Sequence, residues 1–380
     1  MPYLAVSLIR PLRPVLVALI GAWLAGCGPY YSGSGEERAH FDGTRFTNPG
    51  VERDVGAFAF LRWQLTADRS PWPDWVDNEV TDVPPARVDG DALRISYVNH
   101  ATILIQTRGL NILTDPIYSE RASPVQFAGP KRVRAPGVAF DDLPRIDAVV
   151  ISHNHYDHLD LATLERLWDR DAPRILVPLG NDTIIRRAHP VVAAEPMDWG
   201  DRISLTDAVS VQLEPVQHWS ARTGFDTNRA LWGAFIIDTP DGAVYFGGDS
   251  GYGEGAAFKA TAARHPPIRL ALLAIGAYEP RWFMAFSHKN PEEAVRAHCH
   301  LGAAYSLGIH WGTFRLSDEA YWRPLEELVA ARARYGIAAD EFQGFLNGRH
   351  WWVPTLDESA RAPANPVACA ALAQPGPATE

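Results

Sequence analysis

Two spacings of apolar residues along the chain predict most of its regular elements. Apolar runs of four to eight residues, continuous or alternating with polar ones, predict strands. We expect strands at 93–98, 102–107, 110–113, 147–152 and 203–213. Segments with a start signal of Asp, Asn or Pro predict helices at 160–169, 291–301 and 324–334. Strands followed by a helix, twice over, favour an α/β fold of two sheets packed face to face with helices outside.

The strand predicted at 147–152 leads into a dense group of potential metal ligands. His153, His155, Asp157 and His158 follow it in the order H-x-H-x-D-H. Neutral imidazole together with carboxylate is the usual ligand set for Zn²⁺ in proteins. A tight loop at a strand end can aim alternate side chains at one point. The alternative is a solvated polar loop that contains histidines by chance, and the density of ligand types favours a metal site instead.

This motif resembles the signature of the metallo-β-lactamase fold, whose hydrolases hold two metal ions about one bridging hydroxide. The resemblance implies an αββα sandwich, in which two central mixed sheets are flanked by helices, and two Zn²⁺ per chain. It also implies that one zinc is held by His153, His155 and His218, the other by Asp157, His158 and His310, with Asp249 bridging. Each of the later three ligands follows a predicted strand or lies in a glycine-bearing loop. Asp157 and Asp249 are thereby also expected to be catalytic residues.

Two further residues are interpreted from their local contexts. Asp115 stands where the family places a buried aspartate at the end of an early strand, so we expect it to orient the ligand imidazoles. A plain Asp-Pro turn is the alternative for Asp115. His100 is expected to be structural.

The chain has a closer resemblance to one branch, the N-acylphosphatidylethanolamine-hydrolysing phospholipase D group and its bacterial relatives. The stretches that carry this resemblance are 40–49, 98–106, 113–119, 217–222 and 275–284, and the match extends from about 38 to about 352. It implies attack of the hydroxide on a phosphodiester phosphorus, which releases an N-acylethanolamine and leaves phosphatidic acid. A lactonase or small-phosphodiester hydrolase of the same fold is the first alternative. A non-catalytic, metal-binding envelope lipoprotein is the second, although structural zinc sites usually close around four ligands.

One segment departs from the branch. The usual Gln-His-Met-Asn-Pro-like run is replaced by Ser287-His288-Lys289-Asn290-Pro291. His288 corresponds to a histidine near the substrate in the resembling group, where it would protonate the leaving oxygen or bind phosphate. A histidine that caps the following helix or lies on the surface is the alternative for His288.

Five other residues are candidates for substrate contacts. Tyr278, Trp282 and Phe283 could line an acyl-chain channel, although aromatic runs are more often core. Arg222 and Arg281 are candidate phosphate ligands, with structural ion pairs as the alternative.

The N-terminus has the features of an export signal. Arg10 and Arg13 precede the short apolar run 14–25, which ends in Leu24-Ala25-Gly26-Cys27 and resembles the lipobox of bacterial lipoproteins. We expect residues 1–26 to be removed and Cys27 to be lipidated, unless the cysteine follows a generic apolar leader by chance. Gly28 at the next position favours the outer membrane, with the domain facing the periplasm.

These interpretations divide the chain into five segments. They are a signal peptide (1–26), a tether (27–37), an N-terminal extension packed on the core (38–90), a catalytic domain (91–358) and a disordered tail (359–380). After export, Cys299 and Cys369 would be in an oxidising compartment. Their pairing is not favoured, because Cys369 falls in the tail. His298 and His300 flank Cys299 in a predicted helix, where residues two apart point to different faces, so we interpret this group as structural.

The charge balance bears on partners. The formal net charge of the 380-residue chain is −10, and removal of Arg10 and Arg13 with the leader takes it to −12. Such a balance disfavours a large phosphate-backbone interface, so nucleic acid is not an expected partner. A membrane phospholipid is the expected substrate. Homodimerisation occurs in the resembling group and is compatible with this sequence.

Overall fold

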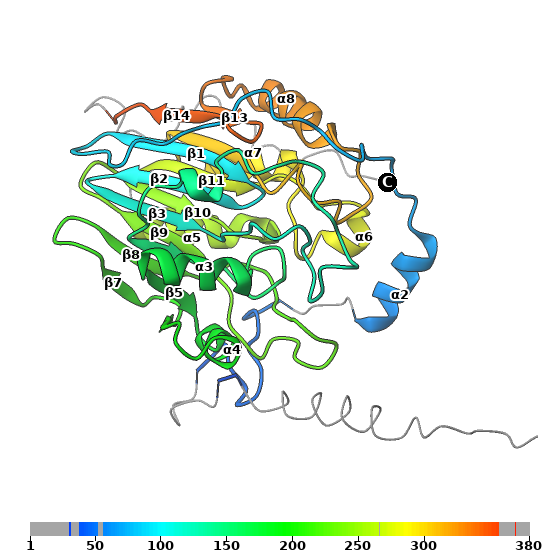
Figure 1. The fold of residues 1–380 in the computed structure, drawn as a ribbon. Helices are drawn as coiled ribbons and strands as arrows, with labels where there is room; N and C mark the ends of the chain where they lie inside the picture. The colour runs from blue at the N-terminus through cyan, green and yellow to red at the C-terminus, as the bar shows by residue number, and fades with distance from the viewer. Residues whose placement is uncertain (1–29, 32–37, 52–55, 266, 357–368, 370–380) are drawn as a thin grey trace, which may run out of the picture.

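Two mixed seven-stranded sheets lie at the centre of the computed structural model, which describes residues 30–31, 38–51, 56–265, 267–356 and 369 (Figure 1). The first sheet has the order β14-β1-β2-β3-β4-β5-β6 and the second β13-β12-β11-β10-β9-β8-β7. The first contains β1 (Leu93–Asn99), β2 (Thr102–Thr107), β3 (Leu110–Thr114), β4 (Ala148–Val150), β5 (Arg174–Pro178), β6 (Glu195–Met197) and β14 (His350–Val353). The second contains β7 (Arg202–Ser204), β8 (Ser210–Glu214), β9 (Ala234–Asp238), β10 (Ala243–Phe246), β11 (Ile268–Ala274), β12 (Tyr305–Ile309) and β13 (Phe342–Gly344).

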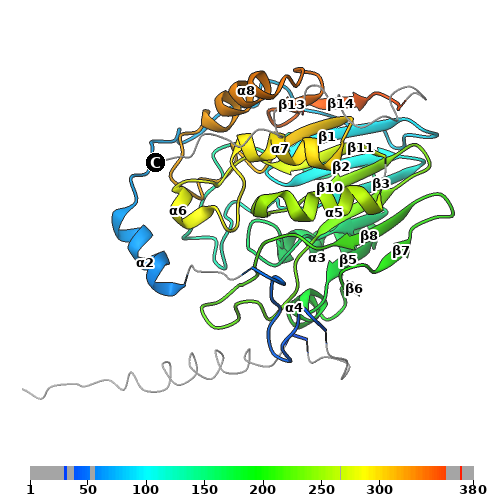
Figure 2. The ribbon, with the colours of Figure 1, turned by 180° about the vertical axis from the view of Figure 1, so that it is seen from behind.

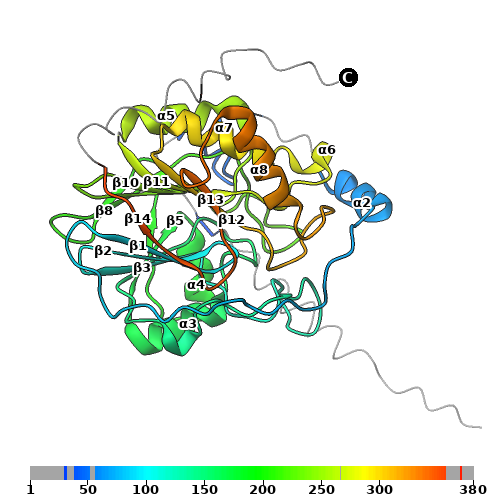
Figure 3. The same cartoon turned by 90° about the horizontal axis from the view of Figure 1, so that it is seen from above.

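Helices cover the outer face of each sheet, which is clearest from above (Figure 3). The first sheet carries α3 (Leu161–Asp171) and α4 (Asn181–Ala188), and the second carries α5 (Ala256–Arg264), α7 (Pro291–Leu301) and α8 (Arg323–Tyr335). At one end of the sandwich, α2 (Ala57–Thr66) lies beside the short α6 (Arg281–Met284), as both side views show (Figures 1 and 2). Two 3₁₀ turns, η1 (Phe140–Asp142) and η2 (Gly253–Gly255), complete the set. The predicted αββα sandwich is confirmed.

Burial on both faces explains the continuous apolar runs in the sequence. Every residue of β11 is buried, because one face of the strand meets the other sheet and the opposite face meets α7. The main core cluster joins side chains of both sheets, whereas a second cluster fills the space between the first sheet and α3.

Two helices begin at the start signals in the sequence. The Asp160 side chain accepts a hydrogen bond from the Thr163 N–H and caps α3. Asn290 and Glu293 form a reciprocal capping box at α7, with Pro291 in the first turn. The predicted bounds of α7 are confirmed.

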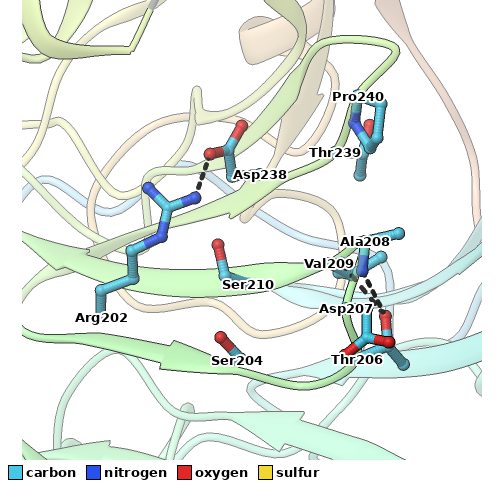
Figure 4. Close-up of a pocket in the computed structure, with 10 residues that line it drawn as sticks. All are labelled: Arg202, Ser204, Thr206, Asp207, Ala208, Val209, Ser210, Asp238, Thr239 and Pro240. Carbon is cyan, nitrogen blue, oxygen red and sulfur yellow. Dashed lines mark hydrogen bonds and ion pairs between the residues drawn. The ribbon is translucent and has the colours of Figure 1, made fainter.

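The strand predicted at 203–213 is wrong in one respect, because the structure divides it into the hairpin β7–β8. The Thr206 hydroxyl accepts hydrogen bonds from the N–H groups of Ala208 (3.2 Å) and Val209 (3.1 Å), which turns the chain. A polar pocket of about 320 Å³ lies here, where Arg202 pairs with Asp238 of β9 at 2.5 Å (Figure 4). It shares no lining residue with the larger pocket described below.

The N-terminal extension contacts the core at several points. The Asn48 amide donates to the carbonyl oxygen of His218 at 2.8 Å, and the Trp72 indole donates to that of Glu319 at 2.9 Å. Cys27, the leader and the tether apart from Tyr30 and Tyr31 lie outside the described residues. The Tyr30 hydroxyl donates a hydrogen bond to Asp226 Oδ2 at 2.9 Å. None of the helices within the described ranges has the length and apolar content needed to span a bilayer.

A disulfide joins Cys299 of α7 to Cys369. The expectation that these cysteines stay unpaired is therefore wrong. The composition of the tail did not predict this bond, because the pairing depends on one tail residue, Cys369, and on its distant partner in α7.

We predict that His298 makes the fold sensitive to acid. Burial lowers the pKa of His298 from 6.5 to about 4, and its Nδ1 lies 2.8 Å from the Ser306 hydroxyl. The unfolded chain binds a proton below pH 6.5 and the folded chain does not until about 4, so stability is lost as the pH falls through this window. Urea unfolding at pH 7 and pH 5 should show a smaller pH effect for His298→Gln, by about 2 kcal/mol. Equal pH effects in the two proteins would contradict this assignment.

Candidate metal centre

The candidate ligands all follow strands that end at the same side of the sandwich. His153, His155, Asp157 and His158 come after β4, and Asp115 follows β3 directly. From the second sheet, the loops after β8, β10 and β12 supply His218, Asp249 and His310. Because β3 and β4 are parallel, as are β10, β11 and β12, their carboxyl ends meet at one edge of each sheet. The two edges face each other across the site.

Three histidines form one cluster of ring nitrogens. His155 Nδ1 lies 2.8 Å from His153 Nε2 and 3.4 Å from His218 Nε2. Burial lowers the pKa of His155 to about 3 and the pKa values of His153 and His218 well below 6.5. These rings are therefore neutral at pH 7, and nitrogens with free lone pairs face one another. That arrangement suits a cation placed between them.

A second cluster contains Asp157, His158 and His310. His158 Nε2 lies 3.2 Å from His310 Nε2, and each of these nitrogens lies 3.3 Å from Asp157 Oδ2. Burial opposes charge on His310, but the nearby carboxylates of Asp249 and Asp157 raise its pKa to about 9. The two carboxylates therefore stabilise a positive charge at this position, which a bound metal ion would provide.

Asp249 lies between the two clusters. Its carboxylate oxygens are 3.2 Å from His158 Nε2 and from His310 Nε2, and 4.0 Å from His153 Nε2. Burial would raise the pKa of Asp249, yet the imidazoles of His310 and His158 hold it well below its usual value. The geometry thus brings together all seven residues predicted as ligands. Their five imidazoles and two ionised carboxylates fit two divalent metal ions, which would take the place of the protons that the carboxylates hold on His158 and His310.

His100 contacts this centre as well, although we expected it to have only a structural role. Its Nε2 lies 2.9 Å from Asp157 Oδ2, and its ring lies 3.8 Å from the His310 ring. It belongs with Asp157, His158 and His310 to one group of possible metal ligands. Its position directly after β1, at the same edge as the other ligands, was the signal that could have revealed it.

Asp115 supports one imidazole of each cluster. Its Oδ2 lies 2.6 Å from His158 Nδ1 and accepts a 2.5 Å hydrogen bond from the Ser152 hydroxyl. The same hydroxyl lies 2.9 Å from His153 Nδ1. Asp115 is fully buried, so these contacts hold the rings in fixed orientations with their Nε2 atoms toward the centre.

Backbone geometry near the ligands is unusual. Asp115 (φ 32°), His100 (φ 48°) and His310 (φ 62°) adopt positive φ values that are costly for residues other than glycine. Gly248, just before Asp249, also has a positive φ, and a Cβ there would lie 2.5 Å from the Ser152 Cβ. Glycine is therefore needed for close packing of two ligand loops.

An open pocket of about 740 Å³ lies over the centre. Its polar lining includes His155, Asp157, Asp249 and His288. Its apolar lining comes largely from α2, α6 and neighbouring loops, and includes Phe60, Trp63, Trp219, Phe283, Met284 and Leu316. The α2 residues were not predicted, because the stretch 57–66 has few polar residues and no N-cap side chain.

His288 lies in this pocket beside Asp249. Its Nδ1 is 3.7 Å from Asp249 Oδ2, and burial lowers its pKa to about 4. The carbonyl oxygen of the preceding Ser287 lies 3.0 Å from His218 Nδ1. The loop that carries His288 therefore also orients a ligand.

Of the other five candidates for substrate contacts, Phe283 lines the pocket, whereas Tyr278, Trp282, Arg222 and Arg281 do not. The Arg222 guanidinium donates to the carbonyl oxygens of Asn154 and Leu159, both at 2.9 Å, and so braces the H-x-H-x-D-H loop. Arg281 forms an ion pair with Glu293 at 2.8 Å. The structural alternatives fit these two arginines.

Two of the three aromatic candidates also lie elsewhere. Tyr278 is buried and Trp282 is 46% exposed, with the Arg62 guanidinium 4.6 Å from the centre of its ring. Phe283, the third aromatic candidate, does line the pocket.

Comparison with known proteins agrees with this fold and site. Residues 110–311 match the family model described as "Beta-lactamase superfamily domain". The chain is 40% identical over 278 residues to an uncharacterized protein of Mycobacterium tuberculosis, which covers 71% of this chain and 72% of that protein. It is 37% identical over 250 residues to N-acyl-phosphatidylethanolamine-hydrolyzing phospholipase D 1 of Caenorhabditis elegans, covering 62% of this chain and 70% of the relative.

A solved structure supports the fold alone. The isothiocyanate hydrolase from Delia radicum gut bacteria superposes with a TM-score of 0.55 at 19% identity, covering 69% of this chain and all of that one. Fold and site together define a metallo-hydrolase. The chain belongs to the beta-lactamase superfamily and has relatives among the phospholipases D that hydrolyse N-acylphosphatidylethanolamine.

Proposed function

We propose that this protein is a dinuclear zinc phosphodiesterase that cleaves an N-acylphosphatidylethanolamine-type phospholipid. One observation carries the proposal: Asp249 reaches both ligand clusters in a pocket whose remaining lining is largely apolar. The carboxylates and histidines can bind the metal cations that promote attack on a phosphate group, and the apolar walls can bind acyl chains. The printed activity of the Caenorhabditis elegans relative supports the same substrate class.

Zinc is the metal favoured by the donor set. The seven predicted ligands are five imidazoles and two carboxylates, whereas calcium and magnesium prefer oxygen ligands. When bound, two such ions supply a hydroxide nucleophile at neutral pH and stabilise the negative charge of the phosphate.

The protein groups around the centre have separate tasks. Asp249 contacts imidazoles of both ligand clusters and holds the clusters side by side. Asp115 fixes the orientation of His158, and His100 fixes that of Asp157. His288 is placed to donate its N–H to a phosphate or leaving oxygen. The aromatic walls from α2 and α6 would hold acyl chains and exclude water.

The location of the protein is part of this proposal. A lipidated Cys27 would anchor the protein in the cell envelope, and outer-membrane sorting would make the domain face the periplasm. Several buried acyl chains, at about 0.8 kcal/mol per CH₂, would give stable attachment beside a phospholipid substrate.

The test is direct turnover. Zinc-loaded full-length protein in detergent micelles with N-acylphosphatidylethanolamine should release N-acylethanolamine and phosphatidic acid, detected by mass spectrometry. Asp157→Asn/His158→Ala should abolish both products. Intact lipid in the presence of two bound zinc ions would contradict the proposed substrate and direct attention to lactones or small phosphodiesters.

A further inference from the structure

A buried lysine lies behind the metal centre and has no part in the mechanism described so far. Lys289 is fully buried in the loop that follows His288. Its Nζ donates to the Ser250 hydroxyl at 2.8 Å and to the Ser250 carbonyl oxygen at 3.2 Å. Ser250 is the residue next to Asp249, so the ammonium group is attached to the loop that carries the central carboxylate.

The ammonium group of Lys289 has no ion-pair partner among the described residues. The carboxylates that attract it are those of Asp249 and Glu293, and Glu293 is paired with Arg281 at 2.8 Å. The Phe258 ring lies 5.5 Å from Nζ on another side. Burial of an ammonium without a paired carboxylate is costly. Burial lowers the pKa of Lys289 to about 8 and outweighs the attraction of these carboxylates, so stability alone does not account for a charge at this position.

The charge balance of the centre supplies a reason. Two divalent cations would be balanced by the carboxylates of Asp115, Asp157 and Asp249 together with one hydroxide. A phosphodiester monoanion would then bring one negative charge without compensation into a buried site. A neutral lactone or ester would bring none.

We propose that Lys289 is a specificity-determining residue, whose positive charge compensates the charge of an anionic phosphodiester and so favours it over neutral substrates. This inference rests on the proposed phosphodiesterase function. Lys289 acts through space, since its hydrogen bonds are to Ser250 rather than to the pocket. Its second effect follows from the same charge, because a cation near the centre repels metal ions as it attracts anions.

The experiment separates charge from packing by means of two variants. Lys289→Gln retains a donor for Ser250 but loses the charge, whereas Lys289→Met loses both. Zinc affinity is measured by competition with a chelator, and the affinity of the zinc-loaded protein for inorganic phosphate by calorimetry. We expect both variants to bind phosphate about tenfold more weakly, which is about 1.4 kcal/mol. We expect both to bind zinc at least as tightly as the parent.

Lys259→Met is the matched control, because Lys259 is an exposed lysine on the neighbouring helix α5. It should leave both affinities unchanged. The proposal is overturned if Lys289→Gln behaves like the parent, if zinc and phosphate both bind more weakly, or if Lys259→Met has the same effect. None of these readouts needs turnover of a lipid. A failure of the proposed function would therefore be distinguished from a failure of this inference.

Discussion

Replacing Asp249 by Asn is expected to lower turnover by at least about 10³-fold, which corresponds to about 4 kcal/mol of transition-state stabilisation. The substitution preserves shape but removes a carboxylate that lies within 4.0 Å of imidazoles from both clusters. Without that charge, the two clusters are no longer held by a shared anion. Metal analysis should show a fall from two ions per chain toward one.

The metal measurement makes this result independent of the substrate. Asp238→Asn is a suitable control, because Asp238 is a partly exposed carboxylate that pairs with Arg202 in the separate polar pocket. It should change neither metal content nor turnover. An Asp249→Asn protein with two tightly bound ions and full activity would contradict the bridging role.

The parts of the site that were predicted correctly depend on local sequence. The ligands His153 to His158 fall within six residues after a strand, so their convergence follows from one loop. The capping box at Asn290 is similarly local, and it set the start of α7 correctly. The later ligands could be placed only through the resemblance to a known family, since spacing alone does not bring His218 and His310 together.

The parts that were missed depend on contacts between distant segments. His100 contacts Asp157 only because the ends of β1 and β4 reach the same edge of one sheet. Phe60 and Trp63 line the pocket because α2 packs against α6, where the Trp63 and Phe283 rings lie 5.0 Å apart. Cys369 pairs with α7 across 70 residues. No hydrophobic period or short motif reports such contacts.

Asp115 shows how a residue outside the ligand set can control the centre, and Asp115→Asn is expected to weaken zinc binding by about 10- to 100-fold. An amide can still accept one hydrogen bond, but it cannot match a carboxylate that contacts His158 at 2.6 Å and the Ser152 hydroxyl at 2.5 Å. Burial raises the pKa of Asp115, while the His158 imidazole beside it lowers that pKa and so favours the ionised form. The loss is read by competition of zinc with a chelator.

Ser152→Ala provides a graded comparison, because it removes the link to His153 but leaves the Asp115–His158 contact in place. We expect a smaller loss of zinc affinity in Ser152→Ala than in Asp115→Asn, and unchanged zinc affinity in Asp238→Asn. If Asp115 were only part of an Asp-Pro turn, Asp115→Asn would retain zinc affinity and lose at most some thermal stability. The order of the three zinc affinities therefore decides between an orienting carboxylate and a turn residue.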